Sequence, residues 1–214
     1  MAAPKKKRSD QTEVTHRKIV FAAYRLFVTE GYSKTTLPAI AKEAMVSLST
    51  VRAIFGTKFM LLDALIKTYT RGDDSPSPLI TRSWWQAILQ EPKPVEQLRR
   101  YAKTVRDIHE RTSNIYEIFR SATPVDVEVA TLRKELNKGR LEDTRTVAVS
   151  LVAKDAVNPD LNTDKLQDIL WTLGSSEIYR MMTLERHWSA DDYELWLAQT
   201  LIASVLQKKF QSLL

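Results

Sequence analysis

The 214-residue sequence has no cysteine, 5 glycines and 8 prolines. Without thiols the chain cannot form disulfides, a thiolate zinc site or a cysteine nucleophile. No apolar run approaches the roughly 18 residues that a membrane span requires, and no apolar segment of a secretory signal follows the basic start. We therefore expect a cytoplasmic protein without a membrane partner, and the scarcity of glycine and proline favours long helices.

Motifs that carry chemistry are also missing. The three histidines, His16, His109 and His187, lie far apart and share no ligand spacing. There is no glycine-rich phosphate loop and no Gly-x-Ser-x-Gly motif, and the Glu-x-x-His formed by Glu13 and His16 has no second copy, which a di-iron bundle would need. We expect no metal, no cofactor and no catalytic site, and an all-α enzyme with dispersed acid–base residues is the less favoured alternative.

Positive charge is concentrated at one end of the chain. The formal net charge is +6, yet residues 1–70 hold 12 Lys+Arg against 5 Asp+Glu, a net charge of +7, and residues 71–214 have a net charge of −1. A basic N-terminal segment joined to a near-neutral C-terminal segment indicates that residues 1–70 bind an anionic partner such as nucleic acid. A solvated charged face is the alternative.

Apolar periodicity and capping residues predict an all-α fold. A helix reaches Gly31, which is placed to end it; Thr36 and Ser47 are placed to cap two short helices, and Thr57 a fourth helix. Two short helices joined by a tight turn and buttressed by longer ones form a helix-turn-helix. Beyond a Gly/Pro/Ser cluster at 71–78 we expect helices near 79–90, 95–110, 113–122, 125–155, 164–186 and 190–211, and no strands.

These patterns predict a domain organisation. We expect a basic disordered arm over 1–12, a helix-turn-helix domain over 13–71 and a helical regulatory and dimerisation domain over 79–214. The last helix has a broad apolar face that packs on its own core and, in a second interpretation, on another subunit. The residues of this predicted dimer interface are Leu197, Leu201, Ile202, Val205 and Leu206.

The stretch from Ile19 to Lys58 resembles the DNA-binding domain of the tetracycline-repressor (TetR) family. The shared features are the Ala-Ala…Leu-Phe face, Gly31-Tyr32, the Thr-Thr pair, Ile40-Ala41…Ala44, Val46-Ser47, Phe55 and Lys58. The resemblance implies a homodimeric repressor whose third helix enters the major groove of a palindromic operator. It also implies that a small molecule binds in the C-terminal helical bundle and changes the spacing between the two DNA-binding domains of the dimer.

Two positions depart from the family pattern. Met45 stands where the family usually has glycine, and a positive φ there would cost a long side chain on the order of 1 kcal/mol. Arg52 stands where relatives have a tyrosine that touches phosphate. Arg52 can bind phosphate in the same way or read guanine as a bidentate donor.

The candidate DNA contacts surround the short third helix. Thr50 and Leu48 are expected at base edges and Ser49 at phosphate, whereas helix N-termini make Thr36 and Lys58 phosphate candidates. Capping alone explains Thr36 and Ser47, and the alternative for Lys58 is a solvated lysine. The full predicted set is Thr36, Ser47, Leu48, Ser49, Thr50, Arg52 and Lys58. The basic arm either lies over the DNA or only raises solubility.

Aromatic and polar residues of the second domain are candidates for an effector pocket, because such pockets are apolar with a few placed polar groups. The predicted set is Trp84, Trp85, Tyr101, His109, Tyr116, Phe119, Arg120, Trp171 and Glu177. For any one of them a plain core role is the alternative. The absence of thiols and histidine clusters favours a small organic effector. The function predicted is therefore that of a ligand-responsive transcription regulator acting at the nucleoid, with an architectural DNA-binding protein without an effector as the alternative.

Overall fold

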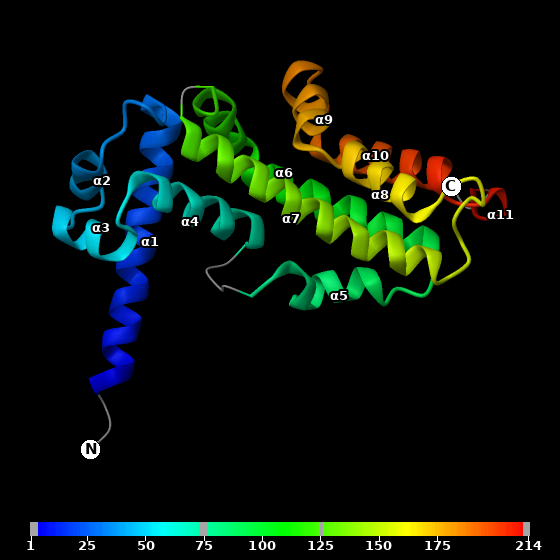
Figure 1. Cartoon of the computed structure of the whole chain (residues 1–214), viewed down its shortest axis with the longest axis horizontal. Coiled ribbons are helices and arrows are strands. Elements are labelled where there is room, and N and C mark those ends of the chain that lie inside the picture. The colour runs from blue at the N-terminus through cyan, green and yellow to red at the C-terminus, as the bar shows by residue number, and fades with distance from the viewer. Residues whose placement is uncertain (1–3, 73–76, 125, 212–214) are drawn as a thin grey trace. The chain divides into compact units, whose positions relative to one another are not determined.

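The computed structural model describes residues 4–72, 77–124 and 126–211, and these are helical for most of their length (Figure 1). Within these ranges the only β contact is an isolated bridge between Val157 and Leu206, so the all-α prediction is confirmed. In chain order the elements are α1 (Pro4–Glu30), α2 (Leu37–Glu43), α3 (Leu48–Phe55), α4 (Lys58–Arg71), the 3-10 turn η1 (Leu79–Thr81), α5 (Ser83–Leu89), α6 (Pro94–Ala122), α7 (Val127–Val152), α8 (Thr163–Leu173), α9 (Ser176–Arg180), the π-helical turn η2 (Met181–Glu185), α10 (Ala190–Val205) and α11 (Lys208–Gln211).

The chain divides into two compact units. Unit 1 comprises Met1–Tyr69 and Asn114–Arg133, and unit 2 comprises Thr70–Ser113 and Lys134–Leu214. Helices α6 and α7 therefore contribute residues to both units. Part of the predicted linker, residues 73–76, lies outside the described residues, and the predicted boundaries at 13–71 and 79–214 remain predictions.

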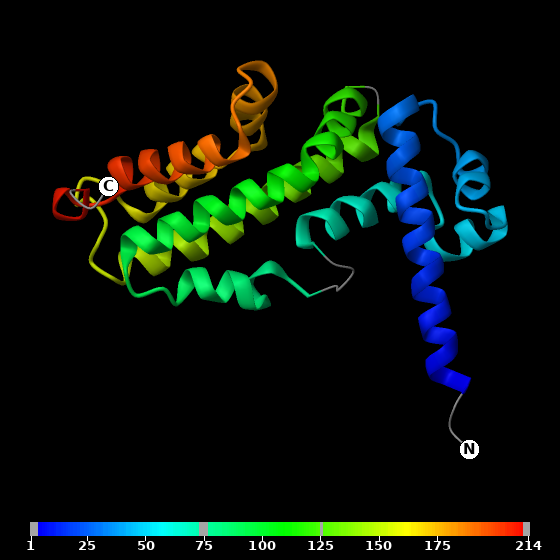
Figure 2. The same ribbon diagram turned by 180° about the vertical axis from the view of Figure 1, so that it is seen from behind.

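Unit 1 is built around the buried face of α1. Ile19, Ala23 and Phe27 are almost completely shielded from solvent, as the helical periodicity predicts. Gly31 ends the helix with a φ of 84°, a conformation that glycine adopts without steric cost. Helices α2 and α3 pack beside this face (Figure 2), where Val51 of α3 is fully buried.

The first helix is longer than predicted. Residues 4–12, expected as part of a disordered arm, are helical in the structure, and residues 1–3 lie outside the described residues. The physical reason is that Pro4 stands at the first helical position and neither glycine nor proline follows it before Gly31. The basic run is therefore presented by a helix rather than by an irregular tail.

Unit 2 has a layered arrangement of helices. In both views α5 lies along one side of the α6–α7 pair, and α8 and α10 lie along the other side (Figures 1 and 2). The core between these layers includes Leu98, Leu151, Leu166 and Leu201, all with no exposed surface. Among the residues that the structure describes, no helix is both long enough and apolar enough to cross a membrane.

Several helix boundaries differ from the predictions. Helix α6 is continuous where two helices, 95–110 and 113–122, were expected, because no glycine or proline interrupts it after Pro94. The expected helix 164–186 is broken after Leu173, and Asn162 caps α8 at its start. A Cβ at Gly174 would lie 2.9 Å from the Leu170 carbonyl oxygen, so only glycine fits at this break.

The C-terminal region is also divided further than predicted. The expected helix 190–211 ends at Val205, and α11 follows as a separate short helix. The Gln207 amide donates to the Ala156 carbonyl (2.9 Å), and the Asn158 amide donates to the Val205 carbonyl (2.8 Å). These long-range backbone bonds replace the intrahelical bonds that would have continued α10.

Candidate nucleic-acid interface and effector site

Helix α3 exposes a row of hydroxyl groups at its start. Ser47 caps the helix by accepting a hydrogen bond from the Thr50 amide (3.0 Å). The Ser47 hydroxyl also lies 2.7 Å from the Ser49 and Thr50 hydroxyl oxygens. Buried Val51 and Phe55 hold the opposite face of the helix on the domain. The predicted capping role of Ser47 is confirmed, and the hydroxyl groups that remain around it match the polar atoms displayed by base edges.

Arg52 lies on the same helix with its side chain exposed. Its guanidinium makes no hydrogen bond or ion pair with any other residue in the described part of the chain. Leu48, one turn earlier, is half-buried. An arginine in this position is available to a phosphate or to a guanine edge, and both alternatives remain open.

Thr36 caps α2. It accepts a hydrogen bond from the Ala39 amide (3.3 Å), and Pro38 occupies the first turn. The side chain is exposed, so the cap leaves Thr36 accessible at a helix N-terminus. Its second predicted role, a phosphate contact, remains a prediction.

Lys58 is held by groups of the connection between α1 and α2. Its ammonium donates to the carbonyl oxygens of Tyr32 (2.8 Å) and Thr35 (3.1 Å) and lies 4.2 Å from the centre of the Tyr32 ring. Burial lowers the pKa of Lys58, and the nearby Asp126 carboxylate opposes that shift. The solvated-lysine alternative is therefore wrong, since Lys58 fixes the connection between α1 and α2. A phosphate contact by this ammonium remains a prediction.

The turn between α2 and α3 has an unusual backbone conformation. Met45 has a φ of 55°, the left-handed region that the family's usual glycine occupies without cost. The side chain is 86% exposed. The strain anticipated from the sequence is present, and no burial of the methionine compensates for it.

The predicted effector residues do not form one group. Tyr116, Phe119 and Arg120 belong to unit 1, where Arg133 donates to the Tyr116 hydroxyl (3.0 Å) and Arg120 pairs with Glu117 (2.9 Å). Phe119 is buried there. Phe119 has the core role of the alternative, whereas Tyr116 is half-buried and Arg120 is exposed, and the remaining predicted residues belong to unit 2.

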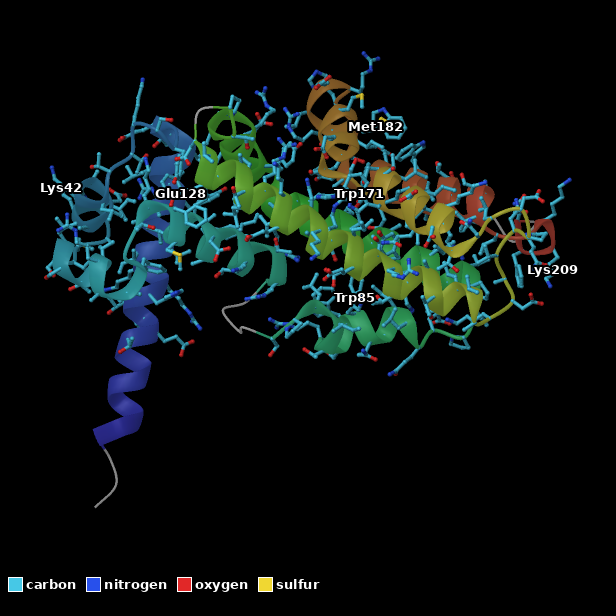
Figure 3. All side chains as sticks on the ribbon, in the orientation of Figure 1. Lys42, Trp85, Glu128, Trp171, Met182 and Lys209 are labelled. Atoms are coloured by element: carbon cyan, nitrogen blue, oxygen red, sulfur yellow. The ribbon has the colours of Figure 1, made fainter. Side chains whose placement is uncertain are left out.

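The residues near α5 also have a core role. The Trp85 ring nitrogen donates to the Thr146 hydroxyl (3.1 Å), and its ring makes edge contacts with Trp84 and Tyr101. Trp85 and Tyr101 are almost fully buried. Figure 3 shows Trp85 and Trp171 on different layers of unit 2, so the two tryptophans do not line one site together.

A polar cluster surrounds the break between α8 and α9. The His109 Nε2 atom donates to the Gly174 carbonyl (3.0 Å), and Arg140 donates to the carbonyls of Trp171 (2.7 Å) and Gly174 (3.2 Å). The Arg140 guanidinium lies 4.2 Å from the centre of the Trp171 ring. Burial lowers the pKa of His109 to about 4, so its imidazole is neutral near pH 7.

This cluster contains polar groups that lack protein partners. Among the described residues, the Tyr193 hydroxyl and the Trp171 ring nitrogen are buried without a hydrogen bond. A buried polar group without a hydrogen-bond partner costs about 1–3 kcal/mol of stability. A ligand that formed a hydrogen bond with either group would remove that cost. Asp143 lies on the same side of α7 as Arg140, and burial raises its pKa to about 6.

Sequence reasoning missed Arg140, Asp143 and Tyr193. On α7 a signal was available, because both charged residues share a helical face with apolar Val147 and Leu151. Charged residues on a face that is otherwise buried are exceptional and indicate a specific role. For Tyr193 no signal was available, because the local sequence does not show whether the hydroxyl of a buried tyrosine has a hydrogen-bond partner.

The predicted dimer-interface residues lie in the core of unit 2 within the single chain, and their part in a dimer remains a prediction. Leu197, Leu201, Ile202, Val205 and Leu206 have 0–1% exposed surface within the single chain, because they face α8 and the core of unit 2. The exposed side of α10 carries Leu195, which is 58% exposed. This side borders a surface groove of about 360 Å³ lined by Arg99, Asp191, Glu194, Leu195, Ala198, Gln199 and Ile202.

Residues 19–65 match the family model described as "Bacterial regulatory proteins, tetR family". The matched segment contains the buried part of α1, all of α2 and α3, and the beginning of α4. The chain carries the N-terminal domain of the tetR family. The predicted helix-turn-helix is thereby confirmed. The matched segment itself has 5 Lys+Arg against 3 Asp+Glu, a net charge of +2, and most of the +7 of residues 1–70 lies in residues 1–18, which precede it.

The fold that accompanies the tetR domain is also found in solved regulator structures. No curated protein sequence matches the chain. The SmeT–triclosan complex has a TM-score of 0.73 at 15% identity and covers 92% of this chain and 93% of its own. NalD, the secondary repressor of the MexAB-OprM multidrug efflux pump in Pseudomonas aeruginosa, has a TM-score of 0.71 at 17% identity and covers 92% and 98%. FadR from Bacillus subtilis in complex with stearoyl-CoA has a TM-score of 0.66 at 15% identity and covers 87% and 97%.

Proposed function

We propose that this tetR-family protein is a ligand-responsive repressor of transcription that binds a palindromic operator as a homodimer. The observation that carries the proposal is the exposed face of α3, where Ser47, Ser49 and Arg52 stand free of the domain core. Hydroxyl and guanidinium groups on a short helix fit the donors and acceptors of the major groove. The net charge of +7 over residues 1–70 supports a duplex partner.

The domain organisation belongs to the same proposal. Residues 13–71 would form the DNA-binding domain, residues 79–214 the regulatory and dimerisation domain, and residues 1–12 a basic arm. The proposal assigns no catalytic step to either domain, and the protein would act in the cytoplasm at the nucleoid.

The effector would bind at the α8–α9 break of unit 2. His109, Trp171 and Glu177 from the predicted set gather there, and Tyr193 adds an unpaired hydroxyl. Aromatic walls with a few placed polar groups suit a small organic molecule. Among structures of the same fold, SmeT is seen with triclosan and FadR with stearoyl-CoA, which shows that this fold accommodates organic ligands in those proteins.

The second copy would pack on the outer side of α10 rather than on the residues first predicted. Leu195 and Gln199 are exposed beside the α6–α10 groove. An isologous contact of this side with its own copy would cover Leu195 and leave the core of unit 2 undisturbed. Leu195→Glu places a charge on this face, and Leu184→Glu changes an equally exposed leucine on η2 as a control.

The central experiment is the selection of duplexes from a random library with the full-length protein, followed by competition with unselected DNA. The proposal expects a palindromic site bound at least a thousandfold more tightly than random DNA, and a mass of two chains by analytical ultracentrifugation. Equal affinity for both DNAs would favour the architectural alternative. A monomer at micromolar concentration would refute the dimer.

The effector part has its own test. Tryptophan fluorescence is titrated with a panel of small organic molecules, and any molecule that changes it is added to the protein–DNA complex. The proposal expects release of the selected duplex and a weaker response in Tyr193→Phe, which lacks only the unpaired hydroxyl. A panel without any response would contradict ligand control.

A further inference from the structure

Met45 combines a strained backbone with an unburied apolar side chain. It is the most exposed of the large apolar side chains among the described residues, at 86%, and its φ is 55°. The left-handed conformation costs a non-glycine residue on the order of 1 kcal/mol. In most proteins such a cost is offset by packing, and Met45 has no such packing.

The turn itself holds Met45 in this conformation. The Met45 amide donates to the Lys42 carbonyl (3.1 Å), and the Val46 amide donates to the Ala41 carbonyl (3.0 Å). These two bonds close the end of α2, whose Lys42 is labelled in Figure 3. Glycine would make the same two bonds without strain, so the backbone gives no reason for a methionine at this position.

The position of Met45 gives that reason. It lies two residues before Ser47, the cap of α3, and consecutive Cα atoms are about 3.8 Å apart. Its flexible side chain therefore starts beside the Ser47, Ser49 and Thr50 hydroxyl cluster. Because Met45 and Ser47 are two residues apart, a duplex bound at these hydroxyl groups would lie near the Met45 side chain.

We propose that Met45 is a specificity-determining residue that contacts the 5-methyl group of a thymine in the major groove. This inference rests on the proposed DNA-binding function. The methionine side chain has no charge and no donor hydrogen, so it cannot bind phosphate. Its polarizable thioether and methyl groups suit an apolar partner, and the thymine methyl is the apolar group that bases display in the major groove.

The test compares protein variants with changes in the DNA. The duplex selected from the random library is resynthesised with deoxyuridine at each thymine in turn, which removes only the methyl group. Affinities are measured for the wild-type protein, Met45→Gly, Met45→Ala and Met45→Leu. Met60→Ala is the matched control, because Met60 is also exposed but lies on α4.

One deoxyuridine position should weaken wild-type binding about fourfold per half-site, the effect of one buried methyl group. Met45→Gly and Met45→Ala should lose a similar factor on the thymine duplex and be insensitive to deoxyuridine at that position. Met45→Leu should retain most of the affinity and the sensitivity. The salt dependence should be the same in all variants because no charge changes, and Met45→Gly should melt no lower than wild type.

Other results would overturn the inference. Undiminished affinity in Met45→Gly, sensitivity to deoxyuridine that persists in this variant, or an equal loss on unselected DNA would each exclude a thymine contact. A loss in Met60→Ala as large as in Met45→Ala would show a general effect of exposed methionines. A wild-type protein that selects no duplex would instead refute the proposed function, an outcome visible before any variant is made.

Discussion

The two units of the protein present their functional groups in opposite ways. In unit 1 the groups assigned to DNA lie on the surface and follow one another within residues 47–52. In unit 2 the groups assigned to the effector come from α6, α8, α9 and α10, and two of them, His109 and Tyr193, are buried. On these assignments, loss of the Ser49 or Arg52 side chain in unit 1 should leave stability unchanged, whereas a change to a buried effector residue of unit 2 should alter ligand binding and stability together.

Arg140→Leu should have the largest effect on stability. The change removes two hydrogen bonds to buried carbonyl groups and the contact with the Trp171 ring. We expect the free energy of unfolding in urea at pH 7 to fall by about 3 kcal/mol. Lys138→Ala on the same helix, where the side chain is 78% exposed, should change it by less than about 0.5 kcal/mol. Similar small losses in both variants would remove the contrast between the units.

The lowered pKa of His109 should make the free energy of unfolding depend on pH. Its folded pKa of about 4 lies below the ordinary histidine value of 6.5, so the unfolded chain binds more protons between these values, and stability falls as the pH falls through this window. From pH 7 to pH 5 this loss is about 2 kcal/mol. Asp143 acts in the opposite direction, because its folded pKa of about 6 lies above the ordinary aspartate value of 3.8 and the folded state is stabilised as the pH falls.

Two variants separate these contributions. His109→Gln should lose less stability than wild type between pH 7 and pH 5, and Asp143→Asn should lose more. Both differences can be measured by urea denaturation at each pH. Parallel pH profiles for all three proteins would contradict the assignment.

Arg52→Ala tests the surface of unit 1. If Arg52 reads a base, the change should cost about 1–3 kcal/mol of binding free energy and relax the preference at one operator position. If it binds phosphate, binding should weaken uniformly and the salt slope should fall by about one. In both cases thermal stability should be unchanged, since the side chain is exposed. A clear loss of stability would show that unit 1 also couples function to packing.

The smallest expected effects concern two serines at the start of α3, and they distinguish a helix-capping role from a DNA-contact role. Ser47→Ala should lower the free energy of unfolding by about 1 kcal/mol, because the Thr50 amide loses its partner. Ser49→Ala removes a neighbouring hydroxyl that caps no helix and should leave stability unchanged. Reduced affinity for the selected duplex in Ser49→Ala would assign Ser49 to DNA. Equal destabilisation of both variants would show that the hydroxyl cluster as a whole, rather than the cap, holds the helix.

Much of unit 1 was predictable because its signals are local. Gly31, Thr36, Ser47 and Thr57 act on backbone groups a few residues away, so their roles could be inferred from spacing alone. The length of α1 was mispredicted because a basic run was taken to indicate disorder. Charge repulsion alone did not prevent a segment free of glycine and proline from forming a helix.

Unit 2 was less predictable because its features depend on contacts between distant segments. A Cβ at Gly174 would lie 2.9 Å from the Leu170 carbonyl oxygen and 3.2 Å from the hydroxyl of Tyr101, which lies on another helix, and the second contact has no signal in the local sequence. The apolar rows of α10 indicated burial but could not distinguish the chain's own core from a second subunit. An apolar face has the same periodicity against either partner.

The sequence by itself determined the all-α fold, the helix-turn-helix with its caps and the concentration of positive charge in residues 1–70. Helical periodicity, capping and charge act over a few residues and need no knowledge of the rest of the chain. Only the tertiary structure decided that Lys58 binds the α1–α2 connection, that the last helix faces inward, and that the Tyr193 hydroxyl is left without a partner. The physical reason is that burial and hydrogen-bond satisfaction depend on which distant groups come together in space.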